Sequence, residues 1–359
     1  MINSRNLQAM DGLQAGTLYN NISLKAFNTF GIEANAAHFW QATTPNEVIE
    51  ALKLAKENNW KILILGGGSN VLLCSDWKGL VLQIALKGIS VVPTEKPNEV
   101  LITAAAGERW HNFVLHSLEL GLYGMENLSL IPGCVGAAPM QNIGAYGAEI
   151  KDTFHSLVAL DRNSLQYRTF SKEECGFGYR ESVFKSSLKD QYIILSVTFK
   201  LSAEGEVNIG YGDIQKVLEA NDITNPGPIE VSRAVITIRE SKLPNPEVIG
   251  NAGSFFKNPE IPESQYLKLA KQYPTMPHYP THPGQVKIPA GWLIEQCGWK
   301  GKKMGELQNY GVHEKQALVL VNYGGATGQQ LWDLALKIQA DVFQKFGINI
   351  QPEVNLIKA

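Results

Sequence analysis

The chain has 359 residues, with 34 acidic and 32 basic side chains and a formal net charge of −2. This near balance argues against nucleic acid or an anionic membrane surface as a partner. The four cysteines lie far apart with no C-x-x-C pair, which disfavours a zinc knuckle and favours a reduced, cytoplasmic location. No apolar run reaches transmembrane length, and no signal-peptide core opens the chain, where residues 1–24 are predicted to be a loose extension.

The next part of the chain has the pattern of a βαβ unit. A strand is predicted at residues 36–41. Thr44 can then cap a helix, Pro45 suits its first turn, and Glu47 completes a capping box. An apolar run at residues 61–65 predicts a second strand after that helix, and this order is typical of a βαβ unit.

Three consecutive glycines, Gly66, Gly67 and Gly68, follow the second strand and precede Ser69 and Asn70. A Rossmann fingerprint would require G-x-G-x-x-G and then a helix, but the residues that follow show no helical pattern. Two interpretations remain. The loop either binds phosphate through its free N–H groups or is a tight turn between two strands.

A strand-rich lobe is predicted from about residue 80 to residue 203. A helix is expected at residues 107–119, with Gly121 as its stop. The apolar runs that predict strands lie at residues 80–84, 89–92, 100–104, 157–161 and 192–201.

Within this lobe, residues 131–148 contain four glycines, two prolines and four alanines, and no charged side chain. Gly and Pro disfavour a regular helix or strand, and the low polarity argues against disorder. The run therefore predicts an ordered, irregular backbone. Such a backbone can approach a pyrophosphate or a flat ring closely, although a tightly packed structural loop is the alternative.

Three polar residues in the middle of the chain have both a structural and a functional interpretation. Arg180 lies in an aromatic setting and would form either an ion pair or a clamp for a substrate carboxylate. Tyr211 lies between two glycines, which suits a surface turn or a lid. Lys242 follows a helix predicted at residues 229–241, where a cation is favoured at the helix C-terminus.

The segment at residues 250–259 combines a flexible glycine with two adjacent phenylalanines and predicts an extended core segment. Strand alternation would place Ser254 and Asn258 on one face, roughly 13 Å apart, which suits contacts to two parts of one long ligand. No His lies nearby in the sequence, so a Ser-His-Asp triad has no local support. His278 and His282 lie on a proline-broken segment, and no metal site is predicted there.

The C-terminal part is predicted to contain a short helix at residues 290–297, a strand at 317–322 and an amphipathic helix at 329–346 that Gly347 ends. A last strand is expected over residues 348–356. Alternation places Glu353 opposite the apolar face of that strand, where a carboxylate is ordinarily solvated.

Taken together, these segments resemble the UDP-N-acetylenolpyruvoylglucosamine reductase family, the flavoenzymes of bacterial cell-wall precursor synthesis. The matching segments run in the family's order over nearly the whole chain after about residue 24, and Tyr211-Gly212-Asp213 resembles the subclass with an extra substrate-covering loop. They are Asn28-Thr29-Phe30-Gly31 and residues 66–72, 131–147, 178–185, 250–259 and 352–354.

The resemblance implies an α+β fold with a flavin-binding cradle of two α/β lobes and a smaller α/β substrate-binding domain. The first lobe would span residues 25–86 joined by 341–359, the second 87–221, and the substrate domain 222–340. It also implies non-covalent FAD, NADPH as co-substrate and UDP-N-acetylglucosamine enolpyruvate as substrate, in a cytoplasmic monomer. NADPH would reduce FAD and leave, and the enolpyruvyl ether would then take its place.

The family match also implies roles for individual residues. Arg180 and Glu353 would polarise the reacting centre, with Glu353 in its acid form or sharing a proton, and Ser254 would donate the proton. Substrate contacts are implied for Tyr146, Tyr211, Lys242, Asn258 and Gln316. FAD contacts are implied for Gly66, Gly67, Gly68, Ser69, Asn70, Val71, Leu72, Ile131, Pro132, Gly133, Gly136, Ala137, Ile143 and Gly144.

The sequence departs from the family pattern at two places. Ala137 and Ala138 stand where relatives often carry a hydroxyl, and Asn355 stands where they often carry a basic residue. Two rival interpretations are a flavin oxidase built on the same cradle and a non-catalytic flavin- or nucleotide-binding protein. Proton donation needs a residue such as Ser254, which a pure binding protein would not require.

Overall fold

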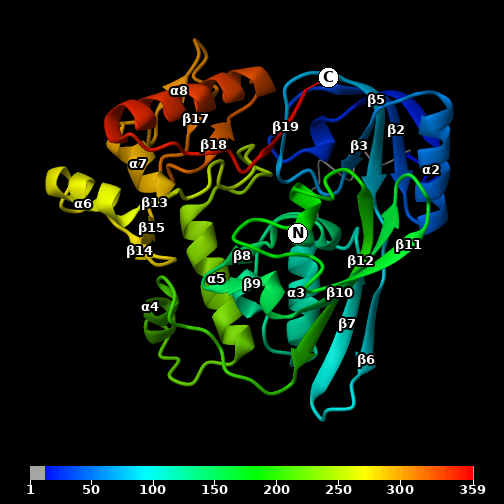
Figure 1. The fold of residues 1–359 in the computed structure, drawn as a ribbon, viewed down its shortest axis with the longest axis horizontal. Helices are drawn as coiled ribbons and strands as arrows, with labels where there is room; N and C mark the ends of the chain where they lie inside the picture. The colour runs from blue at the N-terminus through cyan, green and yellow to red at the C-terminus, as the bar shows by residue number, and fades with distance from the viewer. Residues whose placement is uncertain (1–12, 359) are drawn as a thin grey trace.

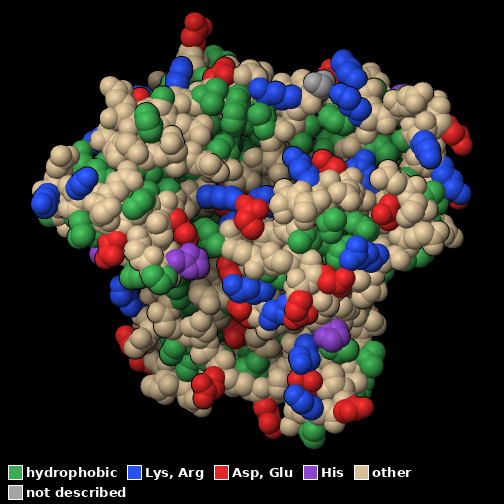
Figure 2. Space-filling model, in the orientation of Figure 1, with side chains coloured by type: hydrophobic (Ala, Val, Ile, Leu, Met, Phe, Trp, Pro, Cys, Tyr) green, Lys and Arg blue, Asp and Glu red, His purple; other side chains and the backbone are tan. Residues whose placement is uncertain are grey.

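A computed structural model describes residues 13–358. It shows an α+β fold in which two sheets and a C-terminal group of helices and short strands surround a central region (Figure 1). The predicted N-terminal extension at residues 1–24 falls in part outside the described residues. No helix of the described part is long and apolar enough to cross a bilayer. Basic and acidic side chains are interspersed over the visible face (Figure 2).

The first sheet has the strand order β1-β2-β5-β3, and helix α2 packs against it. These elements are β1 Leu18–Ser23, β2 Asn35–Ala42, α2 Pro45–Glu57, β3 Ile62–Leu65 and β5 Trp77–Ile84. The capping box predicted at Thr44 and Glu47 is present at the start of α2, where both reciprocal hydrogen bonds form. The predicted βαβ unit is confirmed, although β5 lies between its two strands and pairs in parallel with both.

The second sheet has the order β11-β10-β12-β7-β6 and is antiparallel throughout. Its strands are β6 Ile89–Pro93, β7 Glu99–Ala105, β10 Phe154–Asp161, β11 Tyr167–Ser171 and β12 Tyr192–Ser202. Helix α3, Trp110–Glu119, supplies Trp110 and Phe113 to a buried aromatic cluster with Phe199 of β12. Burial of these rings fixes the N-terminal end of α3 beside the loop that follows it.

The C-terminal part contains five helices and several short strands. The helices are α4 Ile214–Glu219, α5 Pro228–Lys242, α6 Glu263–Gln272, α7 Ala290–Gln296 and α8 Gly328–Phe346. The strands are β13 Glu260–Pro262, β14 Tyr279–Pro280, β15 Gln285–Lys287, β16 Lys303–Met304, β17 Tyr310–Val312 and β18 Leu320–Asn322. Helix α8 ends at Gly347 with φ +64°, as predicted for a glycine stop.

Helix α5 lies between the lobe of the second sheet and the C-terminal elements (Figure 1). Its apolar side packs against α4 and against the short 3₁₀ helix η2, Glu126–Leu128. A hydrogen bond of 2.7 Å joins the hydroxyls of Ser129 and Ser232 across this contact. Helix α5 is therefore anchored to the second lobe.

Two expectations about the chain ends were wrong. Residues 18–23 are not a loose extension, because β1 pairs with β2 as an edge strand, a partnership that the local sequence does not reveal. The strand expected at residues 348–356 is reduced to β19, Asn355–Ile357, which pairs in parallel with β4, Val71–Leu73. Pro352 cannot donate a ladder hydrogen bond, and it forms an isolated bridge with Phe256 in place of a longer strand pairing.

Candidate active site

A cavity of about 1170 Å³ lies among the two lobes and the C-terminal part. It exceeds the range of about 300–1,000 Å³ that is usual for one drug-sized ligand, so it can hold a dinucleotide together with part of a second ligand. All but one of the predicted FAD contacts line it, as do the three predicted catalytic residues Arg180, Ser254 and Glu353. The exception is Leu72, whose side chain is fully buried in β4 and packs into the core.

Two glycine-rich loops form the middle of the cavity wall. The loop after β3 carries Gly67 and the loop before the 3₁₀ helix η3, Val135–Gln141, carries Gly133. A Cβ on Gly67 would lie 3.2 Å from the Cα of Gly133, and a Cβ on Gly133 would lie 2.7 Å from the hydroxyl of Ser69. Gly136 packs just as tightly, because a Cβ there would lie 2.5 Å from that of Ala106. Glycine at these positions lets the two loops pack this closely.

This geometry suits a dinucleotide cofactor. Backbone N–H groups of glycine loops can approach a diphosphate closely, and Gly66, Gly67, Gly68 and Gly133 all line the cavity. The region predicted to be ordered and irregular is ordered here, with the 3₁₀ helix η3 at its centre and the short strands β8, Gly144–Ala145, and β9, Ala148–Glu149, after it.

Arg180 and Glu353 meet across the cavity from distant parts of the chain. The Nε of Arg180 lies 3.3 Å from Oε1 of Glu353, and the guanidinium also donates to the carbonyl of Gly144 at 2.6 Å. Gln141 donates a further hydrogen bond of 3.2 Å to the same carboxylate oxygen. Arg180 has φ +55° at the tip of a tight turn closed by the pairing of Gly178 with Glu181. The ion pair predicted for Arg180 is present, and an arginine in such a pair can also clamp a substrate carboxylate.

Burial raises the pKa of the Glu353 carboxyl, while Arg180, then Lys185 and Lys257, act in the opposite direction. Only 14% of this side chain is exposed, so water screens the carboxyl weakly. Glu353 is therefore not the solvated carboxylate that its strand position would ordinarily give. A carboxyl with a raised pKa and a cation beside it can take up and release a proton at the cavity wall.

Ser254 is exposed to the cavity, and Phe256 and Asn258 line the cavity with it, as the predicted alternation requires. The backbone of this segment is held on both sides, because Ser254 bridges to Val319 and Phe256 bridges to Pro352. The second bridge places the Ser254 segment directly beside Glu353. Asn258 accepts a hydrogen bond of 2.9 Å from the backbone N–H of Ala290, which fixes its amide.

The other predicted substrate residues lie outside the cavity lining. Tyr146 and Tyr211 meet edge to face with ring centroids 6.4 Å apart. Asn127 donates hydrogen bonds to the carbonyls of Tyr146 and Asn208, which joins the start of the Tyr211 loop to η2. Tyr211 is half exposed, so its ring lies over the surface.

Lys242 pairs with Asp213 at 2.7 Å. The hydrogen bonds from Lys242 and Lys216 lower the pKa of Asp213 to about 2, so this carboxylate stays charged near neutrality. Gln316 accepts a hydrogen bond of 3.3 Å from the backbone N–H of Leu318, a residue that lines the cavity. The structure thus brings Lys242 close to the Tyr211 loop and leaves Gln316 at the cavity's margin.

Arg239 is a cavity residue that the sequence analysis missed. It lies on α5, lines the cavity, and its Nε is buried without a hydrogen-bond partner among the described residues. Burial lowers the pKa of this guanidinium, and Tyr146 acts weakly against that effect. The sequence offered one indication of this role: Arg239 lies one helical turn before Lys242, and residues at that spacing share a helix face. A buried guanidinium without a partner is costly unless an anion compensates it.

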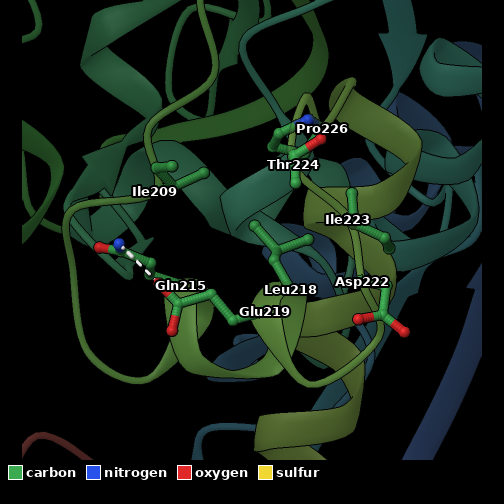
Figure 3. A pocket seen from close by; sticks show the side chains of 8 residues that line it. All are labelled: Ile209, Gln215, Leu218, Glu219, Asp222, Ile223, Thr224 and Pro226. Atoms are coloured by element: carbon green, nitrogen blue, oxygen red, sulfur yellow. Dashed lines mark hydrogen bonds between the residues drawn. The ribbon is translucent and has the colours of Figure 1, made fainter.

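A second hollow of about 410 Å³ lies beside α4 and contains none of these site residues. Figure 3 shows the apolar side chains of Ile209, Leu218 and Ile223 around it and the hydrogen bond between Gln215 and Glu219, which measures 2.9 Å. It neighbours the Tyr211 loop but does not open onto the glycine loops.

The fold and the cavity suit an FAD-dependent oxidoreductase, and the comparison with known proteins shows that class. A family model described as "FAD binding domain" matches residues 36–168. A second, described as "UDP-N-acetylenolpyruvoylglucosamine reductase, C-terminal domain", matches residues 245–357. A reductase of that name from Pseudomonas savastanoi is 52% identical, over 93% of this chain and 97% of the relative. A reductase of the same name from Flavobacterium johnsoniae is 50% identical, over 95% of this chain and 99% of the relative.

The fold agrees with these matches. The crystal structure of UDP-N-acetylenolpyruvylglucosamine reductase from Thermus caldophilus has a TM-score of 0.63, with 21% identity over 95% of this chain and 98% of that one. The chain belongs to the UDP-N-acetylenolpyruvoylglucosamine reductase family, whose enzymes act in peptidoglycan precursor synthesis.

The contact between Arg180 and Glu353 predicts a shift in protonation. Arg180→Met removes the cation that lowers the pKa of Glu353 most, so this pKa should rise further and the carboxyl should stay protonated over a wider pH range. A pH titration of the carboxyl stretch by infrared spectroscopy, with Glu353→Gln as the blank, measures the shift. Arg168→Met, at an exposed arginine, serves as the control. An unchanged titration in Arg180→Met would show that the ion pair does not set this pKa.

Proposed function

We propose that this enzyme uses NADPH to reduce UDP-N-acetylglucosamine enolpyruvate to UDP-N-acetylmuramate. The observation that carries the proposal is that Arg180, Ser254 and Glu353 line one cavity with both glycine loops. When bound, the flavin supplies a hydride. A donor of protons, a fixed cation and a carboxyl of raised pKa are then the groups that an enolpyruvyl ether needs.

Charge is the main problem of this reduction. Hydride addition to the terminal enol carbon leaves an enolate-like dianion on a substrate that already carries a carboxylate. Arg180 presents a guanidinium that the carbonyl of Gly144 and the carboxyl of Glu353 orient before substrate binds. Such a preoriented cation stabilises the developing charge without reorganisation. Glu353, protonated or sharing a proton, adds a hydrogen-bond donor at the same place.

We assign proton donation to the Ser254 hydroxyl. This proton goes to the carbon next to the substrate carboxylate and completes the reduction. A serine hydroxyl is a weak acid, so its donation requires neighbouring groups that stabilise the alkoxide. The Arg180 and Glu353 pair lines the same cavity, and the backbone bridge between Phe256 and Pro352 brings Glu353 beside the Ser254 segment.

The diphosphate and sugar of the substrate would lie toward α5 and the Tyr211 loop. We assign contacts there to Tyr146, Tyr211, Lys242, Asn258 and Gln316. Arg239 joins this set, because its unpartnered guanidinium at the cavity wall calls for an anionic group of a ligand. Closing of the exposed Tyr211 ring over the bound nucleotide sugar would exclude water from the reacting centre.

We assign non-covalent FAD to the two glycine loops and the start of η3. Backbone N–H groups carry most of these contacts, since Ala137 and Ala138 offer no hydroxyl. Leu72 would support the loop from the core instead of contacting the cofactor. The residues assigned to FAD are Gly66, Gly67, Gly68, Ser69, Asn70, Val71, Ile131, Pro132, Gly133, Gly136, Ala137, Ile143 and Gly144.

We further propose a cytoplasmic monomer of three domains. The domains are residues 25–86 with 341–359, residues 87–221 and residues 222–340. Four free cysteines among the described residues support a reducing compartment. The pairing of β19 with β4 supports the return of the C-terminal residues to the first lobe. Light scattering of the purified protein should give a mass near 39.5 kDa.

The reductase activity has a direct test. Purified enzyme under anaerobic conditions should oxidise NADPH continuously only when UDP-N-acetylglucosamine enolpyruvate is present. Flavin reduction that stops at one equivalent and resumes with oxygen would instead indicate an oxidase. Absence of bound flavin and of NADPH oxidation would leave only a binding role.

Replacing Ser254 should separate the two half-reactions. Ser254→Ala should leave flavin reduction by NADPH intact, because no proton passes to carbon in that step. Flavin reoxidation by the enolpyruvyl substrate should slow by about 10²–10⁴-fold, the usual contribution of a positioned acid. Stopped-flow absorbance follows both steps, with Ser90→Ala on exposed β6 as the control. Equal loss in both half-reactions would reject the proton-donor role.

A further inference from the structure

The entry to the second glycine loop depends on a hydrogen bond to a histidine ring. The backbone N–H of Leu130 donates to Nδ1 of His111 at 3.0 Å. His111 is the second residue of α3, and its ring is half-buried. Leu130 directly precedes Ile131, Pro132 and Gly133, which line the cavity. The ring therefore holds the backbone immediately before the assigned FAD contacts.

Leu130 needs such support because its backbone is strained. Its φ is +59°, a left-handed conformation that is unfavourable for a non-glycine residue relative to the right-handed one. Without the acceptor on His111, the chain would gain by leaving this conformation, and the direction of the following residues would change. The strain makes the loop sensitive to one hydrogen bond.

The remaining contacts between α3 and this loop do not titrate. The backbone N–H of Trp110 donates to the carbonyl of Gly133 at 3.0 Å, and its indole donates to the carbonyl of Leu128 at 2.9 Å. The N–H of Val135 donates to the carbonyl of Glu108 at 2.8 Å. His111 is the contact that a change of pH can remove, because protonation converts Nδ1 from an acceptor into a donor.

The surroundings of the ring favour its neutral form. Burial lowers the pKa of His111 from its ordinary value of 6.5, and the guanidinium of Arg239 on α5 acts in the same direction. Arg239 is the charged side chain of the described residues that bears on this ring, and α3 and the loop place no carboxylate against it. Protonation as the pH falls below about 6.5 would thus put a second cation near Arg239 and a donor against the Leu130 N–H.

We propose that His111 is a positioning residue for FAD, which acts through Leu130, and that its protonation weakens FAD binding. The proposal rests on the FAD site assigned above but not on the identity of the substrate. FAD binding is tighter while the ring is neutral and weakens as the pH falls through the lowered pKa of His111. The loss is about fivefold to tenfold in affinity, the order expected for one hydrogen bond of this kind.

Three forms of the holoenzyme test the proposal by FAD fluorescence, which rises when FAD leaves the protein. The dissociation constant of FAD is measured at pH 8.0 and pH 5.5, with circular dichroism to verify folding. His111→Asn places an amide oxygen where Nδ1 lies and cannot titrate, so it should bind FAD tightly at both pH values. His111→Phe keeps a ring but offers no acceptor, so it should bind weakly at both. The wild-type enzyme should bind FAD as tightly as His111→Asn at pH 8.0 and as weakly as His111→Phe at pH 5.5.

A matched control lies on the same helix. His116 is exposed and contacts Glu119 instead of the loop, so His116→Asn should keep the pH dependence of the wild-type enzyme. A dependence that persists in His111→Asn would overturn the proposal, as would wild-type affinity in His111→Phe at pH 8.0. If His111→Phe fails to fold, His111→Asn alone decides. Because the readout is FAD affinity, failure of the reductase assay would not affect it.

Discussion

The architecture of the site depends on close contact between two stretches of bare backbone. The loop after β3 belongs to the first sheet. The loop around Gly133 follows helix α3, which packs in the lobe of the second sheet. A Cβ on Gly67 would lie 3.2 Å from the Cα of Gly133, and a Cβ on Gly133 would lie 2.7 Å from the Ser69 hydroxyl, so either would crowd the seam. Glycine at these two positions lets the loops meet closely and leaves N–H groups free for a ligand. Cofactor binding and lobe packing therefore impose the same constraint on the same residues.

Electrostatics at the cavity wall follow from burial. The ion pair of Arg180 with Glu353 has exposed fractions of only 19% and 14%, so its value for stability is small or negative. Its value is chemical, because a carboxyl between an arginine and Gln141 has a defined orientation before substrate arrives. Arg239 differs in having no carboxylate partner, and a ligand anion would compensate it. The site thus combines one cation that is held in place with one that lacks a partner.

The local elements could be predicted from sequence because their signals are local. Thr44 and Glu47 form the expected capping box, and Gly347 ends α8 in the left-handed conformation. Motif similarity placed Arg180, Ser254 and Glu353 in one site, and the cavity contains all three. Contacts that depend on distant packing could not be predicted. The position of β5 between β2 and β3 and the pairing of β1 with β2 depend on how the strands pack together, and the cavity that Arg239 lines is assembled from segments far apart in the chain.

The remaining feature that sequence patterns did not indicate is where the backbone is strained. Leu130, Asn142, Tyr146 and Arg180 all have positive φ, and all belong to the loops around the cavity. Each is held by a specific polar contact. Asn142 donates to Glu149 and to the carbonyl of Gly178, and Asn127 holds the carbonyl of Tyr146. Strained residues persist only where surrounding contacts over-determine them. Polar side chains such as those of His111, Asn127 and Asn142 therefore matter for binding although none of them lines the cavity, because they keep the loops in conformations that an isolated chain would leave.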